Sequence, residues 1–224
     1  MNTSVRDMDV VGERCDYVFC RSEERGGSGD PGPQTARGVF HGIRASVRRV
    51  FGTDSLEGWV VLVQGTGSVG GPLAKELAAA GARVLASDVL PERAERFGEV
   101  IPAEAVVGTE CDVYAPCALG GTLNAETIPR LRCRIVAGSA NNQLAEPEDA
   151  ERLRAAGILY APDFVINAGG VLYALGLEYL GWTREQIEER HARIGGTLEE
   201  IYARAEAEGL TTEAAAEQLA RARL

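Results

Sequence analysis

Residues 59–88, WVVLVQGTGSVGGPLAKELAAAGARVLASD, decide the fold of this chain of 224 residues. The β-branched run 60–63 is typical of a buried parallel strand. A glycine-rich turn follows, then a helix over 69–79 and a second strand over 82–86. The stretch therefore predicts a strand–helix–strand unit, which is the repeating element of a parallel sheet covered by helices.

The turn between the first strand and the helix has the spacing G-x-G-x-x-G. Gly65 permits a tight turn, Gly67 lets the backbone approach a pyrophosphate, and Gly70 lets helix and strand pack closely. Asp88 follows eighteen residues after Gly70, where a carboxylate can accept hydrogen bonds from a ribose. A plain turn is the alternative, but strand, helix, second strand and acid together favour a dinucleotide site made of Gly65, Thr66, Gly67, Ser68, Val69, Gly70, Asp88 and Val89.

The composition narrows the class of partner. Apolar residues make up 45% of the chain, enough for a hydrophobic core, and the net charge is −10. That charge argues against nucleic acid or an anionic membrane as the main partner. No apolar run reaches the roughly 18 residues of a membrane-spanning helix, and we expect no signal peptide. The five cysteines form no C-x-x-C pair and no metal-ligand spacing, so we expect no metal site, no disulfide framework and a cytoplasmic location.

Alternating patterns along the rest of the chain extend the parallel sheet. We predict further strands at 105–107, 111–115, 134–137 and 158–160, with helices at 2–20, 35–51, 92–97, 124–131, 148–156, 171–180, 185–207 and 212–224. Thr3 or Ser4 caps the first helix, Thr211 or Thr212 caps the last, and the pair Gly195-Gly196 kinks or breaks the helix before it. The prediction is an α/β fold, a Rossmann-type doubly wound parallel sheet with a helical N-terminal segment and C-terminal helices.

These elements suggest three regions. Residues 1–34 combine the first helix with a Gly/Pro-rich loop, residues 35–182 form the Rossmann domain, and residues 183–224 form the C-terminal helices. A loop of the length of 21–34 is often functional in a compact domain, and an interdomain linker is the compatible alternative.

Three polar loops directly follow predicted strands, where ligands bind in an open α/β sheet. Asn141, Asn142 and Asn167 supply the donors and acceptors that a carboxamide needs, so we place them at the nicotinamide end of the cofactor. Asp163 is an acid in contact with the substrate or a turn residue after Pro162. His191 and the single lysine, Lys75, are interpreted as residues of solvated helix faces, and His41 as a residue at the surface or core edge.

Four motifs, LVQGTGSVGG (62–71), CDVYAPCALGG (111–121), VAGSANNQLA (136–145) and GILYAPDFVINAGG (157–170), resemble the cofactor domain of the Glu/Leu/Phe/Val dehydrogenases. The branched-chain and phenylalanine members of actinobacterial type are the most similar, and the resemblance extends over nearly the whole chain. It implies reversible oxidative deamination of an L-amino acid, with NAD taking the hydride.

The resemblance also implies roles for single residues. Cys117 and Ala118 match a loop beside the adenosine, and Thr35 matches a threonine that contacts the nicotinamide carboxamide. Asn141 or Asn142 matches an asparagine near substrate and nicotinamide, and Asn167 matches one near the nicotinamide. Asn141 and Asp163 are our catalytic candidates.

Family members place two lysines and an aspartate of the catalytic site in an N-terminal domain, and the 224 residues contain no match to it. Met1 aligns where valine is usual, so we expect a gene start assigned too late or a truncated form. Without those groups the chain is expected to bind NAD and to deaminate amino acids weakly or not at all.

Two alternatives remain open at this point. One is a stand-alone oxidoreductase acting on an imine-like or other small substrate, with Asp163, Arg21 or His41 as proton donor. The other is a non-enzymatic NAD-binding subunit that needs a partner chain. Apolar residues in the N-terminal segment favour homodimerisation or a partner that covers them: Val10, Val11, Tyr17 and Phe19.

Overall fold

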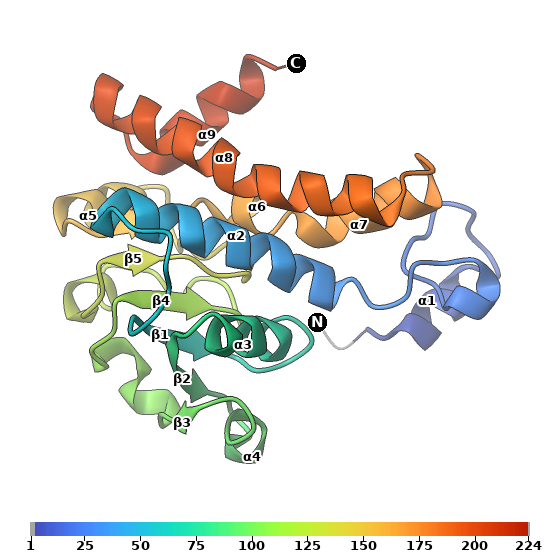
Figure 1. The fold of residues 1–224 in the computed structure, drawn as a ribbon, viewed down its shortest axis with the longest axis horizontal. Helices are drawn as coiled ribbons and strands as arrows, with labels where there is room; N and C mark the ends of the chain where they lie inside the picture. Colours follow the sequence, from blue (N-terminus) through green and yellow to red (C-terminus); the bar gives the residue numbers. More distant parts are fainter. Residues whose placement is uncertain (1–2, 224) are drawn as a thin grey trace.

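The computed structural model describes residues 3–223, and a sheet of six parallel strands lies at its centre (Figure 1). The strand order is β3-β2-β1-β4-β5-β6. The strands are β1 (Val60–Gln64), β2 (Arg83–Ser87), β3 (Glu99–Val100), β4 (Val113–Pro116), β5 (Ile135–Val136) and β6 (Leu159–Tyr160). This order confirms the predicted Rossmann-type doubly wound sheet, because the chain builds outward from β1 to one edge and then from β4 to the other.

The helices around the sheet are α1 (Val5–Val11), α2 (Gly32–Phe51), α3 (Gly70–Ala79), α4 (Pro91–Ala94), α5 (Asp149–Ala155), α6 (Asp163–Ile166), α7 (Gly169–Glu178), α8 (Arg184–Glu208) and α9 (Thr212–Arg221). Short 3-10 helices lie at Glu23–Arg25, Ala103–Gly108 and Ile128–Arg130. In Figure 1 α2 lies between the sheet and α8, while α1 lies at one end of the molecule, away from the sheet.

The two faces of the sheet have separate cores. On one face, Val61 and Val63 of β1 pack with apolar side chains of α2, α3, α8 and α9. On the other face, Leu62 packs with side chains of α5 and of two of the 3-10 helices. Since consecutive β1 side chains point to opposite faces and both faces are covered, the strand reads as a continuous apolar run.

The predicted helix over 2–20 is wrong beyond its first part. The helix α1 begins after Ser4, whose hydroxyl and Asp7 form a capping box, and it ends at Val11 before Gly12. No residue of α1 is buried, so no apolar stripe holds a longer helix against the fold. The predicted start at residue 2 and the predicted end of the last helix at residue 224 lie outside the described residues.

The third strand also differs from the prediction. Residues 105–107 lie in the 3-10 helix Ala103–Gly108, and β3 is formed by Glu99 and Val100 at the edge of the sheet. Pro102, which precedes this helix, has a restricted φ and no N–H to donate to a neighbouring strand. The apolar residues after it therefore form a helical turn instead of a strand.

The C-terminal helices follow the prediction, except at two points. The helix α8 runs unbroken through Gly195, where a Cβ would lie 3.1 Å from the His41 carbonyl oxygen, so this glycine permits close packing of α8 on α2. His191, predicted on a solvated face, is fully buried. Among residues 3–223, no helix has the length and apolar character needed to cross a membrane.

Candidate functional site at the carboxyl ends of β1 and β4

The glycine-rich turn lies at the point where the strand order reverses. Gly65 follows β1 with φ of +88°, and its N–H donates to the Ser87 carbonyl at 2.7 Å. A Cβ on Gly65 would lie 2.9 Å from Cβ of Ala118, which follows β4 together with Cys117. The register of β1 on β4 thus brings two of the predicted loops into contact, at the place where doubly wound sheets bind ligands.

The other two glycines of the motif differ in their surroundings. A Cβ on Gly70, the first residue of α3, would overlap the carbonyl oxygen of Gly65, so the helix packs tightly on the turn. Gly67 is exposed, and apart from its two chain neighbours no residue of the described chain comes within 4 Å of the place its Cβ would take. Val69 at the N-cap gives α3 no side-chain hydrogen bond. The Gly71 N–H donates to the Gly67 carbonyl at 3.1 Å and Pro72 has no N–H, so the Gly70 N–H is the group at the start of the helix that stays available to an anion.

Asp88 closes β2 beside the turn. Its Oδ2 accepts hydrogen bonds from the Thr66 N–H at 2.8 Å and the Thr66 hydroxyl at 3.0 Å, and its Oδ1 accepts the Leu90 N–H at 3.1 Å. Burial works against ionisation, but these hydrogen bonds and the charge of Arg93 outweigh it, and the pKa of Asp88 lies below its ordinary value. Asp88 is therefore an anion at neutral pH, and the neighbouring Val89 is 85% exposed.

Cys117 has no features of a nucleophile. Burial raises the pKa of its thiol, and hydrogen bonding with Ser139 only partly opposes that shift. Since the thiol form is unreactive, Cys117 acts here as a small side chain that packs where the carboxyl ends of β4 and β5 meet.

Two of the predicted asparagines are joined. The Asn167 side-chain amide donates to Oδ1 of Asn141 at 2.6 Å and to the Ser139 carbonyl at 3.3 Å. This pair links the loop after β5 to the turn between α6 and α7. Asn142 does not join this pair. It adopts φ of +51°, and its carbonyl accepts the Gly121 N–H at 2.7 Å. Its side chain lines the cavity that also contains Asp163.

Thr35 lies in the first turn of α2, which is wedged between two backbone segments of the site. A Cβ on Gly32 would lie 2.5 Å from the Ser68 carbonyl oxygen, and a Cβ on Gly170 would overlap the Thr35 hydroxyl. The hydroxyl donates to the Pro31 carbonyl at 3.2 Å. The start of α2 thus brings Thr35 between the glycine-rich turn and the start of α7.

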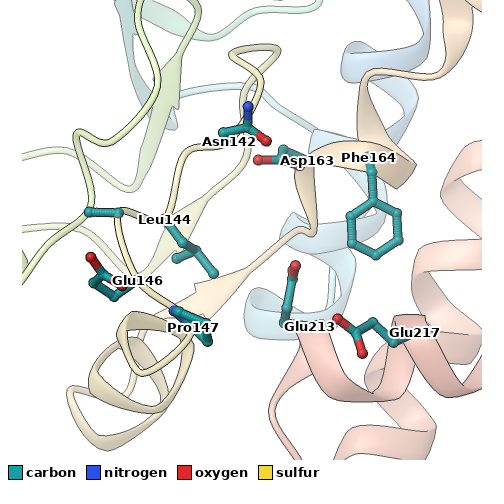
Figure 2. A pocket seen from close by; sticks show the side chains of 9 residues that line it. Asn142, Leu144, Glu146, Pro147, Asp163, Phe164, Glu213 and Glu217 are labelled. Atoms are coloured by element: carbon teal, nitrogen blue, oxygen red, sulfur yellow. The ribbon is translucent and has the colours of Figure 1, made fainter.

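Asp163 lines a cavity of about 310 Å³, together with Asn142 (Figure 2). Its Oδ2 accepts the Gln143 N–H at 2.8 Å, and its own N–H donates to the Tyr160 hydroxyl at 3.3 Å. The carboxylate therefore holds the loop after β5 in place. Its proposed role as a catalytic acid stays a prediction.

Glu213 extends from the start of α9 into the same cavity (Figure 2). Its Oε2 is buried without a hydrogen-bond partner in the described chain. Burial, and then the charges of Asp163 and Glu217, raise the pKa of Glu213 to about 7. Sequence patterns gave no sign of this group, because Glu213 is an ordinary residue for the first turn of a helix.

We expect Glu213→Gln to stabilise the protein at pH 8 by about 1–2 kcal/mol and to leave stability nearly unchanged at pH 4. A raised folded-state pKa means that ionised Glu213 destabilises the fold, and this cost grows between pH 4.5 and 7. Urea unfolding at the two pH values measures the difference. Glu217→Gln, a change at an exposed site on the same helix, is the control and should give a much smaller effect. Equal stability of wild type and Glu213→Gln at pH 8 would contradict the assignment.

His191 lies outside the site and contacts the backbone at the start of α7. Its Nε2 lies 3.0 Å from the Gly169 carbonyl oxygen, so this ring nitrogen donates to the start of α7. The sequence contained the signal that places it: positions 187, 191, 194 and 198 of α8 recur at helical spacing, and all are buried. Sequence reasoning also missed three residues that shape the loops, namely Gly32, Ser139 and Gln143. Residues 3–223 contain no group of three or more His, Cys, Asp or Glu side chains placed to hold a metal ion.

The strand order, the turn at the switch point and the acid that ends β2 define a Rossmann-type α/β domain. The sequence model of the Glutamate/Leucine/Phenylalanine/Valine dehydrogenase family matches residues 87–224. The chain belongs to this family of amino acid dehydrogenases.

Individual relatives agree with this assignment. The chain is 44% identical to the leucine dehydrogenase of Bacillus cereus over 229 residues, covering 100% of this chain and 62% of that protein. It is 41% identical to the valine dehydrogenase of Streptomyces albus over 232 residues, covering 100% of this chain and 64% of that protein. The crystal structure of L-tryptophan dehydrogenase from Nostoc punctiforme superposes with a TM-score of 0.83 at 40% identity, covering 86% of this chain and 60% of that one. The chain thus spans about 62% of the length of the leucine dehydrogenase.

Proposed function

We propose that this chain binds NAD and forms the cofactor half of a hydride-transfer site for an L-amino acid and its 2-oxo acid. The observation that carries the proposal is the turn at the switch point. Open space at Gly67, the uncapped Gly70 N–H at the start of α3 and an ionised Asp88 fit a pyrophosphate and a ribose diol along one edge of the sheet.

The remaining site residues would hold the nicotinamide end. Thr35 offers a hydroxyl group, and the Asn141–Asn167 pair offers amide groups, to orient a carboxamide. The neighbouring residues are small, so a flat ring could lie close to their backbone. NAD would accept or donate the hydride, and the protein's contribution is to fix the position and orientation of the ring. Cys117 and Ala118 would pack beside the adenosine.

The same residues offer no amine base for deamination. Lys75 is the single lysine of the 224 residues, and it lies exposed on α3. Loss of a positioned acid or base costs about 10²–10⁴-fold in rate. We therefore propose that these 224 residues alone bind the cofactor and deaminate amino acids weakly or not at all, with Asn141 and Asp163 as the groups nearest to a bound substrate.

The proposal also includes a partner chain, three regions of the sequence and a cytoplasmic location. Val10 is 65% and Tyr17 is 93% exposed in the N-terminal segment, and a second copy or a partner chain would cover them and complete the cleft. The division into residues 1–34, 35–182 and 183–224 is retained as a proposal. The five cysteines are free, as a reducing cytoplasm would keep them.

Titration of the purified chain with NADH, followed by nicotinamide fluorescence, tests the proposal. We expect saturable binding that ADP competes away. A substrate screen with L-amino acids and NAD, 2-oxo acids with ammonia and NADH, and cyclic imines with NADH should give little or no turnover. Rapid turnover of an amino acid would overturn the claim that further groups are needed, and turnover of imines alone would favour the stand-alone oxidoreductase. Absence of NADH binding would overturn the function itself.

A further inference from the structure

The segment that leads into α2 is tied to α7 by one carboxylate. Oε1 of Glu178, at the end of α7, accepts three hydrogen bonds: from the Cys20 N–H at 2.9 Å, from the Ser28 N–H at 3.0 Å and from the Ser28 hydroxyl at 2.5 Å. The bonds span about 150 positions of sequence and hold both ends of the loop between residues 20 and 28 at one point. No basic side chain of the described chain pairs with Glu178. The hydrogen-bond donors that its carboxylate meets come from this loop instead.

The loop is closed and shaped for this contact. The Gly29 N–H donates to the Arg21 carbonyl at 2.9 Å, which closes the neck, and the Tyr173 hydroxyl of α7 donates to the Ser28 carbonyl at 3.2 Å. Cys20 adopts φ of +64°, a conformation that a residue with a side chain takes only when its surroundings require it. The Cys20 N–H aimed at Glu178 is that requirement.

The other end of α7 touches the residues that follow the loop. A Cβ on Gly169 would overlap the Gln34 carbonyl oxygen, and a Cβ on Gly170 would overlap the Thr35 hydroxyl. The helix α7 therefore contacts residues 20–35 twice, through Tyr173 and Glu178 at the loop and through its two glycines at the first turn of α2. Because the loop of residues 20–28 is fixed on α7, the first turn of α2, which follows it, is held in one position against Gly169 and Gly170.

We propose that Glu178 is a positioning residue for the nicotinamide end of the cofactor. It anchors the loop of residues 20–28, and through that loop it sets the place of Thr35 against Gly170 at the start of α7, three residues after Asn167. This inference rests on the proposed binding of NAD. Glu178 itself touches neither the turn after β1 nor Asp88, and the start of α2 meets that turn at Ser68 alone, so we expect the adenosine and pyrophosphate part of the site to depend on Glu178 much less than Thr35 does.

The test compares two ligands that differ in the nicotinamide half. Calorimetric titrations with NADH and with ADP are made on wild type, Glu178→Gln and Glu178→Ala. We expect Glu178→Ala to weaken NADH binding about tenfold, the equivalent of one hydrogen bond of ordinary strength, and ADP binding less than twofold. Glu178→Gln keeps an acceptor oxygen but loses the charge, so its loss of NADH affinity should be intermediate.

Two further variants sharpen the comparison. Thr35→Val should lose NADH affinity selectively, and the double variant with Glu178→Ala should lose no more than the larger single loss, because both act through one contact. Glu24→Ala removes an exposed carboxylate from the same loop and should leave both affinities unchanged. Thermal unfolding of each variant records any general loss of structure, and Glu178→Gln serves if Glu178→Ala fails to fold.

The outcomes separate the inference from the function on which it rests. Equal loss of NADH and ADP affinity, or no loss of either, would overturn the positioning role while leaving NAD binding intact. A wild-type chain that binds neither ligand would overturn the proposed function, and the inference with it.

Discussion

Replacing Gly138 by alanine should destabilise the fold by about 3 kcal/mol or more. Gly138 is buried two residues after the end of β5, and a Cβ there would overlap the Pro116 carbonyl oxygen and lie 2.5 Å from the Pro116 nitrogen. That oxygen already accepts the Ala140 N–H at 2.9 Å. Because the atoms in the way are backbone of the neighbouring strand, no side-chain rotation relieves the clash. Urea unfolding measures the loss.

Gly67→Ala is the matched control, since it adds the same methyl group at a glycine of the same site. Its Cβ meets open space and its φ is not positive, so stability should stay within about 0.5 kcal/mol of wild type. NADH affinity should fall by at least about tenfold, because the methyl group would take the place where we propose that the pyrophosphate approaches. A Gly138→Ala protein as stable as wild type would show that β4 and β5 do not approach as closely as described. A Gly67→Ala protein with full NADH affinity would move the pyrophosphate elsewhere.

The strand–helix–strand unit around the glycine-rich turn was predictable because each of its parts is specified locally. Strands β1 and β2 and helix α3 lie within one or two residues of their predicted bounds. Buried parallel strands read as apolar runs, and a strand followed by glycines and a helix leaves few other folds open. The second half of the sheet followed from the same pattern, although β5 and β6 are only two residues long.

The errors lie where long-range contacts decide the local structure. β3 has two residues, one of them Glu99, so it carries no pattern of its own and exists only by pairing with β2. The segment after α1 is held by Glu178, about 160 positions away in sequence, rather than by helical hydrogen bonds. His191 is buried although its sequence neighbours are charged, because it falls on the apolar side of α8 with Ile187 and Ile194.

In the candidate site, too, some features are specified locally and others depend on long-range contacts. The glycines and Asp88 are recognisable because backbone geometry and charge demand those residue types at those positions. The asparagine pair could be expected only as three polar loops at one edge of the sheet. Which asparagine meets which, Asn141 with Asn167 and Asn142 apart, depends on the φ of Asn142 and on loop contacts that no spacing reveals.

Asp88→Asn should change the choice of cofactor more than it changes the fold. In the proposed site the ionised carboxylate would accept hydrogen bonds from a ribose and repel a 2′-phosphate, so its neutral isostere should bind NADH about tenfold more weakly. NADPH binding should strengthen by a similar factor, and the preference for NADH over NADPH should fall by about 10²-fold. Competition titrations of both dinucleotides against ADP measure the ratio.

The internal hydrogen bonds of Asp88 require a control for structure. Asparagine retains one oxygen for the Thr66 N–H and hydroxyl, so thermal stability should fall by no more than about 1–2 kcal/mol. Glu92→Gln removes the same charge from α4, four positions along the chain, and should leave the ratio of affinities near that of wild type. If Glu92→Gln shifts the ratio as far as Asp88→Asn does, the selectivity comes from the general negative potential of a chain with net charge −10. If only Asp88→Asn shifts it, the selectivity comes from one carboxylate at the end of β2, where the sequence motif placed it.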